Sequence, residues 1–161
     1  MKTQGNILTR KRSRRGFTLI ELIVAFSILI TLTAMAVPLA RYKVRRDKER
    51  ELDAALREIR RAIDKYKDAS DKGEIQVKLE TEGYPETLEI LVEGVKKNGA
   101  VDKKYKFLRR IPKDPFTNST DWGKRAWQDD PKSTSWGGQN VFDVYTKSTE
   151  RAPDGTAYSE R

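Results

Sequence analysis

The stretch RRGFTLIELIVAF, Arg14 to Phe26, decides how the rest of this chain is interpreted. An arginine pair precedes Gly16, and the apolar run that follows contains one acid, Glu21. The run extends over residues 17–40, and Glu21 is the only charged residue in it. A carboxylate in the middle of a membrane helix costs roughly 2.5–3.5 kcal/mol on insertion scales. The presence of Glu21 in this run therefore needs an explanation.

The composition limits the chemistry that the chain can perform. Its 161 residues are enough for one modest globular domain and a terminal segment. There is no cysteine and no histidine. Disulfides, thiolate metal sites and catalytic sites built on cysteine or histidine are therefore excluded. We expect the protein not to be an enzyme, since no motif supports the alternative of a membrane-anchored enzyme.

The formal net charge of +9 is unevenly distributed. Six basic residues and no acid lie within residues 1–16, and the remaining 27 Lys and Arg residues nearly balance the 24 acids. A basic protein often binds nucleic acid. Here much of the excess precedes an apolar segment, where basic residues set membrane topology and contact anionic lipid.

Three interpretations of residues 17–40 are open. As a helix, the segment would span roughly 36 Å, enough for a transmembrane anchor. It also resembles a secretory signal peptide, with an A-x-A site at Ala34–Ala36, but its apolar run exceeds the usual length and contains Glu21. In the third interpretation, the chain is cut between Gly16 and Phe17. The apolar run then stays on the mature chain, with Glu21 as its fifth residue.

The sequence GFTLIEL, Gly16 to Leu22, resembles the class III leader of type IV pilins and type II secretion pseudopilins. In that family a membrane-embedded prepilin peptidase cuts after the glycine and methylates the new amino group. The resemblance implies cleavage between Gly16 and Phe17 and N-methylation of Phe17. It also implies that Glu21 pairs with the ammonium group of Phe17 on a neighbouring subunit. Such pairing would offset the cost of burying Glu21, and the positive end of the helix dipole favours an anion there.

Pro38 is the twenty-second residue of that mature chain, a position where these families often carry proline. Proline removes a backbone donor and clashes with the preceding turn. We expect Pro38 to be a point where the helix bends or melts during filament packing; an ordinary membrane-helix kink is the alternative. Six basic residues precede the apolar segment and six follow within 41–50. Since charge does not fix the orientation, a cytoplasmic leader is what the resemblance implies.

The helix is predicted to continue beyond the apolar segment. Residues 41–70 contain no Gly or Pro, and one apolar stripe recurs at spacings of three and four: Leu52, Leu56, Ile59, Ile63 and Tyr66. Gly73 supplies a stop. Residues 17–70 would form one helix of roughly 80 Å. The predicted organisation is a cleaved leader (1–16), a transmembrane and filament-core helix (17–40), and a periplasmic part (41–161).

The C-terminal half predicts short elements. Pro85 suits the first position of a short helix that continues to Val95 and closes near Asn98–Gly99. Alternating patterns predict strands at residues 105–111, 122–128 and 141–147. The predicted fold class is α+β: a long N-terminal helix, transmembrane in its first half, packed on a small antiparallel β-sheet in a pilin-like arrangement.

Later segments resemble the G-type major pseudopilin of type II secretion: GYPETLEILVEGV, LRRIPKDPFTN and FDVYTKS. Phe116 and Thr117 replace the family's usual Trp-Gly, and residues 119–140 are longer and more polar. Three tryptophans lie in that region, Trp122, Trp127 and Trp136, and we expect them to pack against the sheet or helix, with subunit contact as the alternative.

G-type pseudopilins carry an acidic C-terminal loop that binds calcium. The corresponding stretch of this chain has only Glu150, Asp154 and Glu160. Calcium is coordinated by about six to eight oxygen ligands in proteins. We therefore expect no cofactor and no tight calcium site, with Asp154 as the remaining candidate ligand. The loop acids are expected to be solvated rather than ligands: Asp121, Asp129 and Asp130.

The resemblance implies a structural pseudopilin that leaves the bacterial inner membrane and packs helix to helix into a periplasmic pseudopilus driving protein secretion. Its expected partners are copies of itself, the prepilin peptidase, other pseudopilins and inner-membrane secretion components. The alternative is a type IV pilin of a surface or DNA-uptake pilus. In a DNA-uptake pilus, basic residues 41–50 and 103–113 would contact phosphate; we expect instead that they are solvated and that no nucleic acid binds.

Overall fold

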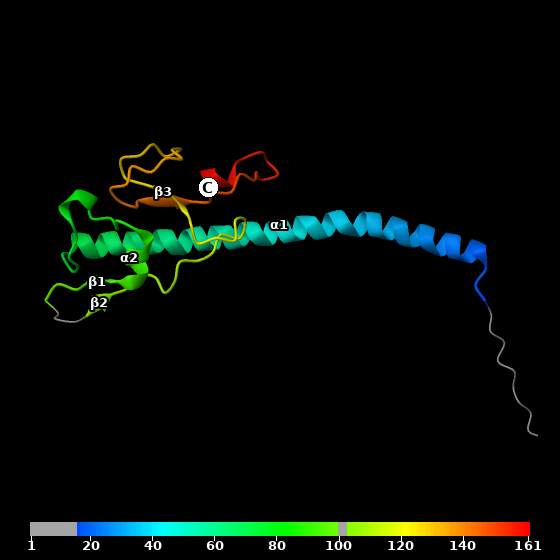
Figure 1. The fold of residues 1–161 in the computed structure, drawn as a ribbon, viewed down its shortest axis with the longest axis horizontal. Coiled ribbons are helices and arrows are strands. Elements are labelled where there is room, and N and C mark those ends of the chain that lie inside the picture. The colour runs from blue at the N-terminus through cyan, green and yellow to red at the C-terminus, as the bar shows by residue number, and fades with distance from the viewer. Residues whose placement is uncertain (1–15, 100–102) are drawn as a thin grey trace, which may run out of the picture. The chain divides into compact units, whose positions relative to one another are not determined.

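The computed structural model describes residues 16–99 and 103–161 (Figure 1). The chain divides into two compact units, Met1–Lys43 and Val44–Arg161. The described part of the first unit is mainly the beginning of helix α1 (Leu19–Asp71). The second unit contains the rest of α1 and seven short elements: η1 (Leu79–Thr81), α2 (Leu88–Glu93), β1 (Val95–Lys96), β2 (Lys104–Tyr105), β3 (Gly123–Arg125), β4 (Asp143–Tyr145) and η2 (Tyr158–Glu160).

The predicted apolar stripe of α1 forms the base of the core. Its five members, from Leu52 to Tyr66, are each at most 4% exposed. The predicted stop is also confirmed, since α1 ends at Asp71 and Gly73 has φ +65°. The Gly73 amide donates to the Ser70 carbonyl and the Glu74 amide to the Ala69 carbonyl, both at 2.9 Å. This pair of bonds is a Schellman motif, which satisfies carbonyls that the helix end leaves free.

The segments after α1 cover this stripe. Core residues come from every part of the second unit: Ile75, Leu88, Leu91, Leu108, Trp122, Val141, Val144, Ala152 and Tyr158. The indole Nε1–H of Trp122 donates to the Pro112 carbonyl at 2.9 Å. Core packing is therefore confirmed for Trp122, while Trp136 is only partly buried and Trp127 is 57% exposed.

The α+β class is confirmed, with a long helix packed on small antiparallel sheets rather than on a single sheet. Strand β1 pairs with β2 through Val95 and Tyr105. The predicted strand at 105–111 is wrong beyond Tyr105. The Phe107 and Leu108 amides both donate to the Leu91 carbonyl at 3.0 Å, so this backbone is hydrogen-bonded to α2 rather than to a neighbouring strand. The other pair, β3 with β4, lies within the predicted strands 122–128 and 141–147 but is shorter.

The short helix α2 also differs from its prediction. It begins at Leu88, so Pro85 is not its first residue; Pro85 is buried and its carbonyl accepts the Val141 amide at 2.7 Å. The helix ends at Glu93 and is capped by Gly94, whose φ of +84° is not helical. An added Cβ at Gly94 would lie 2.8 Å from the Tyr105 carbonyl oxygen, so this position also needs glycine where β2 approaches. The predicted end near Asn98 is therefore wrong.

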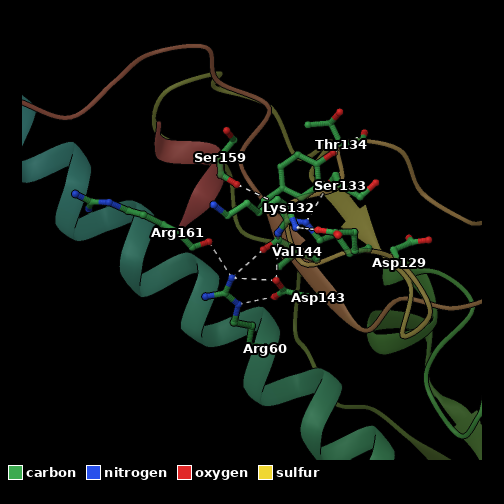
Figure 2. Close-up of polar contacts among 12 residues, drawn as sticks. Arg60, Asp129, Lys132, Ser133, Thr134, Asp143, Val144, Ser159 and Arg161 are labelled. Atoms are coloured by element: carbon green, nitrogen blue, oxygen red, sulfur yellow. Dashed lines mark hydrogen bonds and ion pairs between the residues drawn. The ribbon is translucent and has the colours of Figure 1, made fainter. Parts of the chain in front are cut away.

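A polar cluster ties β4 and the C-terminal segment to α1 (Figure 2). The Arg60 guanidinium of α1 donates to the Asp143 carboxylate at 2.7 Å and to the main-chain oxygens of Val144 and Arg161 at 3.2 and 3.0 Å. The buried Arg125 guanidinium donates to the same carboxylate at 3.3 Å and to the Ser159 carbonyl at 3.1 Å. One carboxylate thus lies between two guanidinium groups from different elements.

Candidate processing and assembly site

The predicted cleavage point lies in non-helical backbone. Residues Gly16 to Thr18 precede α1, and the side chain of Phe17 is 75% exposed. A Cβ built on Gly16 would have no neighbour within 4 Å. This geometry leaves the Gly16–Phe17 bond open to a protease. Cleavage and methylation there stay predictions, and the rest of the predicted leader, residues 1–15, lies outside the described residues.

Thr18 caps the start of α1. The Glu21 amide donates to the Thr18 hydroxyl oxygen at 3.3 Å, and the Leu22 amide donates to the Thr18 carbonyl at 3.2 Å. A threonine followed three residues later by glutamate is the sequence pattern of a capping box. Thr18 is not among the residues predicted above to have a role, although the T-L-I-E spacing of residues 18–21 carries that signal. The cap fixes the residue at which the helix begins, and with it the position of Glu21.

Glu21 lies in the first turn of α1, as predicted, and is exposed. It lines a shallow open hollow of about 360 Å³ with four apolar residues: Ile20, Val24, Ala25 and Ile28. Among the described residues, no basic nitrogen lies within 4 Å of its carboxylate. The helix dipole is therefore the charge interaction that the described part of this chain offers Glu21. Its pairing with Phe17 of another copy stays a prediction.

The beginning of α1 presents a long apolar surface. Its large apolar side chains are 45–77% exposed: Leu19, Ile20, Leu22, Ile23, Val24, Phe26, Ile28, Leu29, Ile30 and Leu32. The hydroxyls of Ser27, Thr31 and Thr33 donate to carbonyls four residues earlier at 2.7–2.8 Å. Because these hydroxyls are satisfied within the helix, they do not need water, and the surface suits apolar surroundings.

Within the described residues, no helix is both long enough and apolar enough to cross a membrane. Helix α1 runs through Pro38 without interruption, although the side chain of Pro38 is outside the described set. The predicted membrane span of residues 17–40 and the predicted bending at Pro38 stay predictions.

Asp154 is the candidate calcium ligand of the C-terminal loop. Asp154 is exposed and accepts the Thr156 amide at 2.9 Å, a hydrogen bond that lowers the pKa of Asp154. In the part of the chain that the structure describes, no three acidic side chains are placed to hold a metal ion. The absence of a tight calcium site stays a prediction.

All three loop acids have contacts in the structure, and the exposed Asp130 accepts the Lys132 amide at 2.9 Å. The expectation that Asp129 is simply solvated is wrong, because its Oδ2 accepts the amides of Ala126 and Gly137 at 2.7 and 3.1 Å. It therefore closes the 126–137 loop. Asp121 is exposed and pairs with Lys147 at 2.6 Å, which lowers the pKa of Asp121.

An exposed glycine, a capped helix start, an acid in the first turn and a long apolar surface thus follow one another within a short segment. Residues 11–37 match the prokaryotic N-terminal methylation motif. The match supports a type IV pilin-like or pseudopilin family, as the resemblance of GFTLIEL indicated. No curated protein and no solved structure matches the chain.

The motif carries three implications for the molecule. It implies processing by a prepilin peptidase and assembly of pilin-like subunits into a filament. It implies membrane anchoring before the subunit joins a periplasmic or extracellular filament. Proteins with this motif are structural rather than enzymatic.

Proposed function

We propose that this protein is a pseudopilin that assembles into a periplasmic pseudopilus and drives type II protein secretion. The observation that carries the proposal is the methylation motif, together with the structure of the residues that follow its predicted cleavage point. Glu21 lies in the first turn of a capped helix, and the apolar surface that follows is exposed in the single chain. A surface of this kind needs either lipid or a neighbouring subunit to cover it.

Assembly explains both the apolar surface and its acid. Before assembly, residues 17–40 would cross the inner membrane once, with the leader in the cytoplasm. In the filament, the same side chains would pack against neighbouring helices, and Glu21 would meet the methylated amino group of Phe17 on the next copy. That ion pair would offset the cost of burying Glu21 and would set the axial position of each subunit.

The choice of secretion rather than a surface pilus is supported by the segment LRRIPKDPFTN. Its Asp114 is 2% exposed and accepts hydrogen bonds from the Phe116 amide and the Thr146 hydroxyl. The segment that resembles G-type pseudopilins is therefore folded around this acid. The alternative function, a type IV pilin of a surface or DNA-uptake pilus, shares the N-terminal features.

The test is expression of the full chain with its peptidase in cells that lack the native copy. We expect Glu21→Ala to be processed normally but to form no filaments, and Glu51→Ala, on the exposed surface of the second unit, to behave as wild type. Normal filaments from Glu21→Ala would contradict the assembly role of Glu21. Loss of the wild-type chain should abolish protein secretion; loss of surface pili with normal secretion would favour the alternative function.

A further inference from the structure

Charge changes sign between two consecutive segments of the second unit. Residues 74–93 contain six glutamates and one lysine, whereas residues 95–113 contain eight lysines and arginines and one aspartate. In Figure 1 the green turn of η1 lies above α1, and the β1–β2 hairpin lies below it. The turn and the hairpin therefore lie on different sides of α1, although Glu74 and Ile75, at the start of the acidic segment, are hydrogen-bonded or bridged to Asn98 and Lys97 next to the hairpin.

The turn formed by residues 77–82, which we name the hook, contains two glutamates and one lysine. Leu79 is 100% exposed and is followed by exposed Glu80 and Glu82, while the preceding Lys78 pairs with Glu86 at 2.8 Å. Glu82 has φ +54°, a left-handed conformation that is uncommon for glutamate. The turn is closed by bonds from the Thr81 hydroxyl to the Lys78 carbonyl and from the Tyr84 amide to the Thr81 carbonyl. The hook thus presents an exposed apolar side chain that is followed by two exposed glutamates.

A groove of about 570 Å³ lies between α1 and the segment after β2. Ala54, Ala62 and Phe107 supply apolar lining, and four cations supply the charge: Arg57, Arg61, Lys65 and Arg109. Glu58 is the one acid in the lining. The groove therefore combines a few apolar side chains with a mainly positive rim, opposite in charge to the glutamates of the hook.

The rim cations are not neutralised within their own chain as far as it is described. Among the described residues, none of the four lies within 4 Å of a carboxylate oxygen. Arg57, Arg61 and Lys65 follow one another at intervals of four along α1, where like charges repel. An external anionic group would relieve this repulsion.

We propose that the hook of one copy docks into the groove of the next copy along the filament. The inference rests on the proposed function. Leu79 would lie against Ala54 and Phe107, with its neighbouring glutamates facing the arginines of the rim. Because the contact joins two different surfaces, it is heterologous and can repeat as an open helical array. Complementary charge would select the register of one globular unit on the next.

The absence of native cysteine allows a direct test by cross-linking full-length chains in assembled filaments. We expect the variant carrying Leu79→Cys and Ala54→Cys to give a ladder of covalent oligomers on mild oxidation. The matched control carries Leu79→Cys and Gln128→Cys, which places the second thiol at another exposed position. The control and each single variant should give no ladder beyond dimers.

Charge reversal tests the ionic part of the contact. Arg61→Glu in the cross-linking variant should lower the yield of oligomers about tenfold, and adding Glu82→Arg should restore it. Filaments that form without a ladder would overturn the docking and leave the proposed function standing. Failure of the wild-type chain to form filaments would overturn the proposed function itself. No ladder, together with DNA binding that Arg61→Glu abolishes, would assign the groove to nucleic acid and overturn the docking.

Discussion

Tyr158 joins the C-terminal segment to α1, and removing its hydroxyl should lower the stability of the second unit. Its side chain is fully buried, and its ring stacks on Phe116 with centroids 4.3 Å apart. The hydroxyl accepts a hydrogen bond from Arg45 Nε at 3.1 Å and donates one to Glu49 Oε1 at 2.5 Å. Both partners belong to α1 and carry charge. One hydroxyl therefore connects η2 to two turns of the long helix.

Replacing Tyr158 by phenylalanine removes the hydroxyl and keeps the ring. Hydrogen bonds to charged groups contribute about 1.5–3 kcal/mol each when they are desolvated. Arg45 and Glu49 are only half-buried and regain water in the variant, so we expect a loss of about 1–2 kcal/mol in total. Tyr158→Ala also removes the ring from the core and should cost about 3–5 kcal/mol.

The assay is urea unfolding of the full chain in detergent, followed by tryptophan fluorescence. All three tryptophans lie in the second unit, so the signal reports that unit. With a urea dependence of about 1–3 kcal/mol per molar, the phenylalanine variant should unfold at a urea concentration lower by about 0.5–1.5 M. The same midpoint for wild type and Tyr158→Phe would refute the argument that the hydroxyl holds η2 on α1.

The pH dependence provides a second readout of the same group. Burial, and then the hydrogen bond to Glu49, raise the pKa of Tyr158. An unfolded tyrosine ionises near pH 10, whereas the folded chain keeps this proton to higher pH. The stabilisation is therefore complete below about pH 10 and is lost as pH rises from there towards the folded pKa. Wild type should lose stability more steeply than Tyr158→Phe in that range; equal slopes would contradict the raised pKa.

Three further variants test other parts of the structure. Thr18→Ala removes the cap of α1 and should reduce the stability of its first turn by about 1 kcal/mol, seen as faster amide hydrogen exchange there; unchanged exchange would contradict the cap. Gly123→Ala places a Cβ 2.3 Å from the Tyr145 ring. This clash should lower the urea midpoint by the equivalent of about 1–3 kcal/mol, and adding Tyr145→Leu should restore the midpoint. Asp143→Asn leaves the buried Arg125 guanidinium without its carboxylate and should lower the free energy of unfolding by about 3 kcal/mol. Asp121→Asn, at an exposed pair, should lower it by less than about 1 kcal/mol. Equal losses for the two variants would contradict the stabilising role of the Asp143 cluster.

Features set by nearby residues could be predicted from the sequence. The stripe from Leu52 to Tyr66 follows from helical periodicity, and Gly73 ends the helix because its left-handed conformation closes a local hydrogen-bond pattern. The same applies to the motif around Gly16 and Glu21. Thr18 belonged to this local class as well and could have been recognised from the capping-box spacing.

Features set by distant partners could not be predicted in this way. The segment 105–111 has a strand-like pattern, but the Leu91 carbonyl accepts two of its amides and holds it on α2. Arg60 and Asp143 are separated by 83 positions in sequence, and nothing local distinguishes either from the chain's other charged residues. Asp129 resembled a solvated loop acid until the fold brought the Ala126 and Gly137 amides to its carboxylate.

The intact mass of the chain extracted from cells that contain the prepilin peptidase tests the central claim most directly. We predict a protein that lacks residues 1–16 and carries one additional methyl group, with Phe17 at its N-terminus. A chain that begins at Val37 would show instead that residues 1–36 are a secretory signal peptide, and an uncut chain of 161 residues would contradict processing at Gly16.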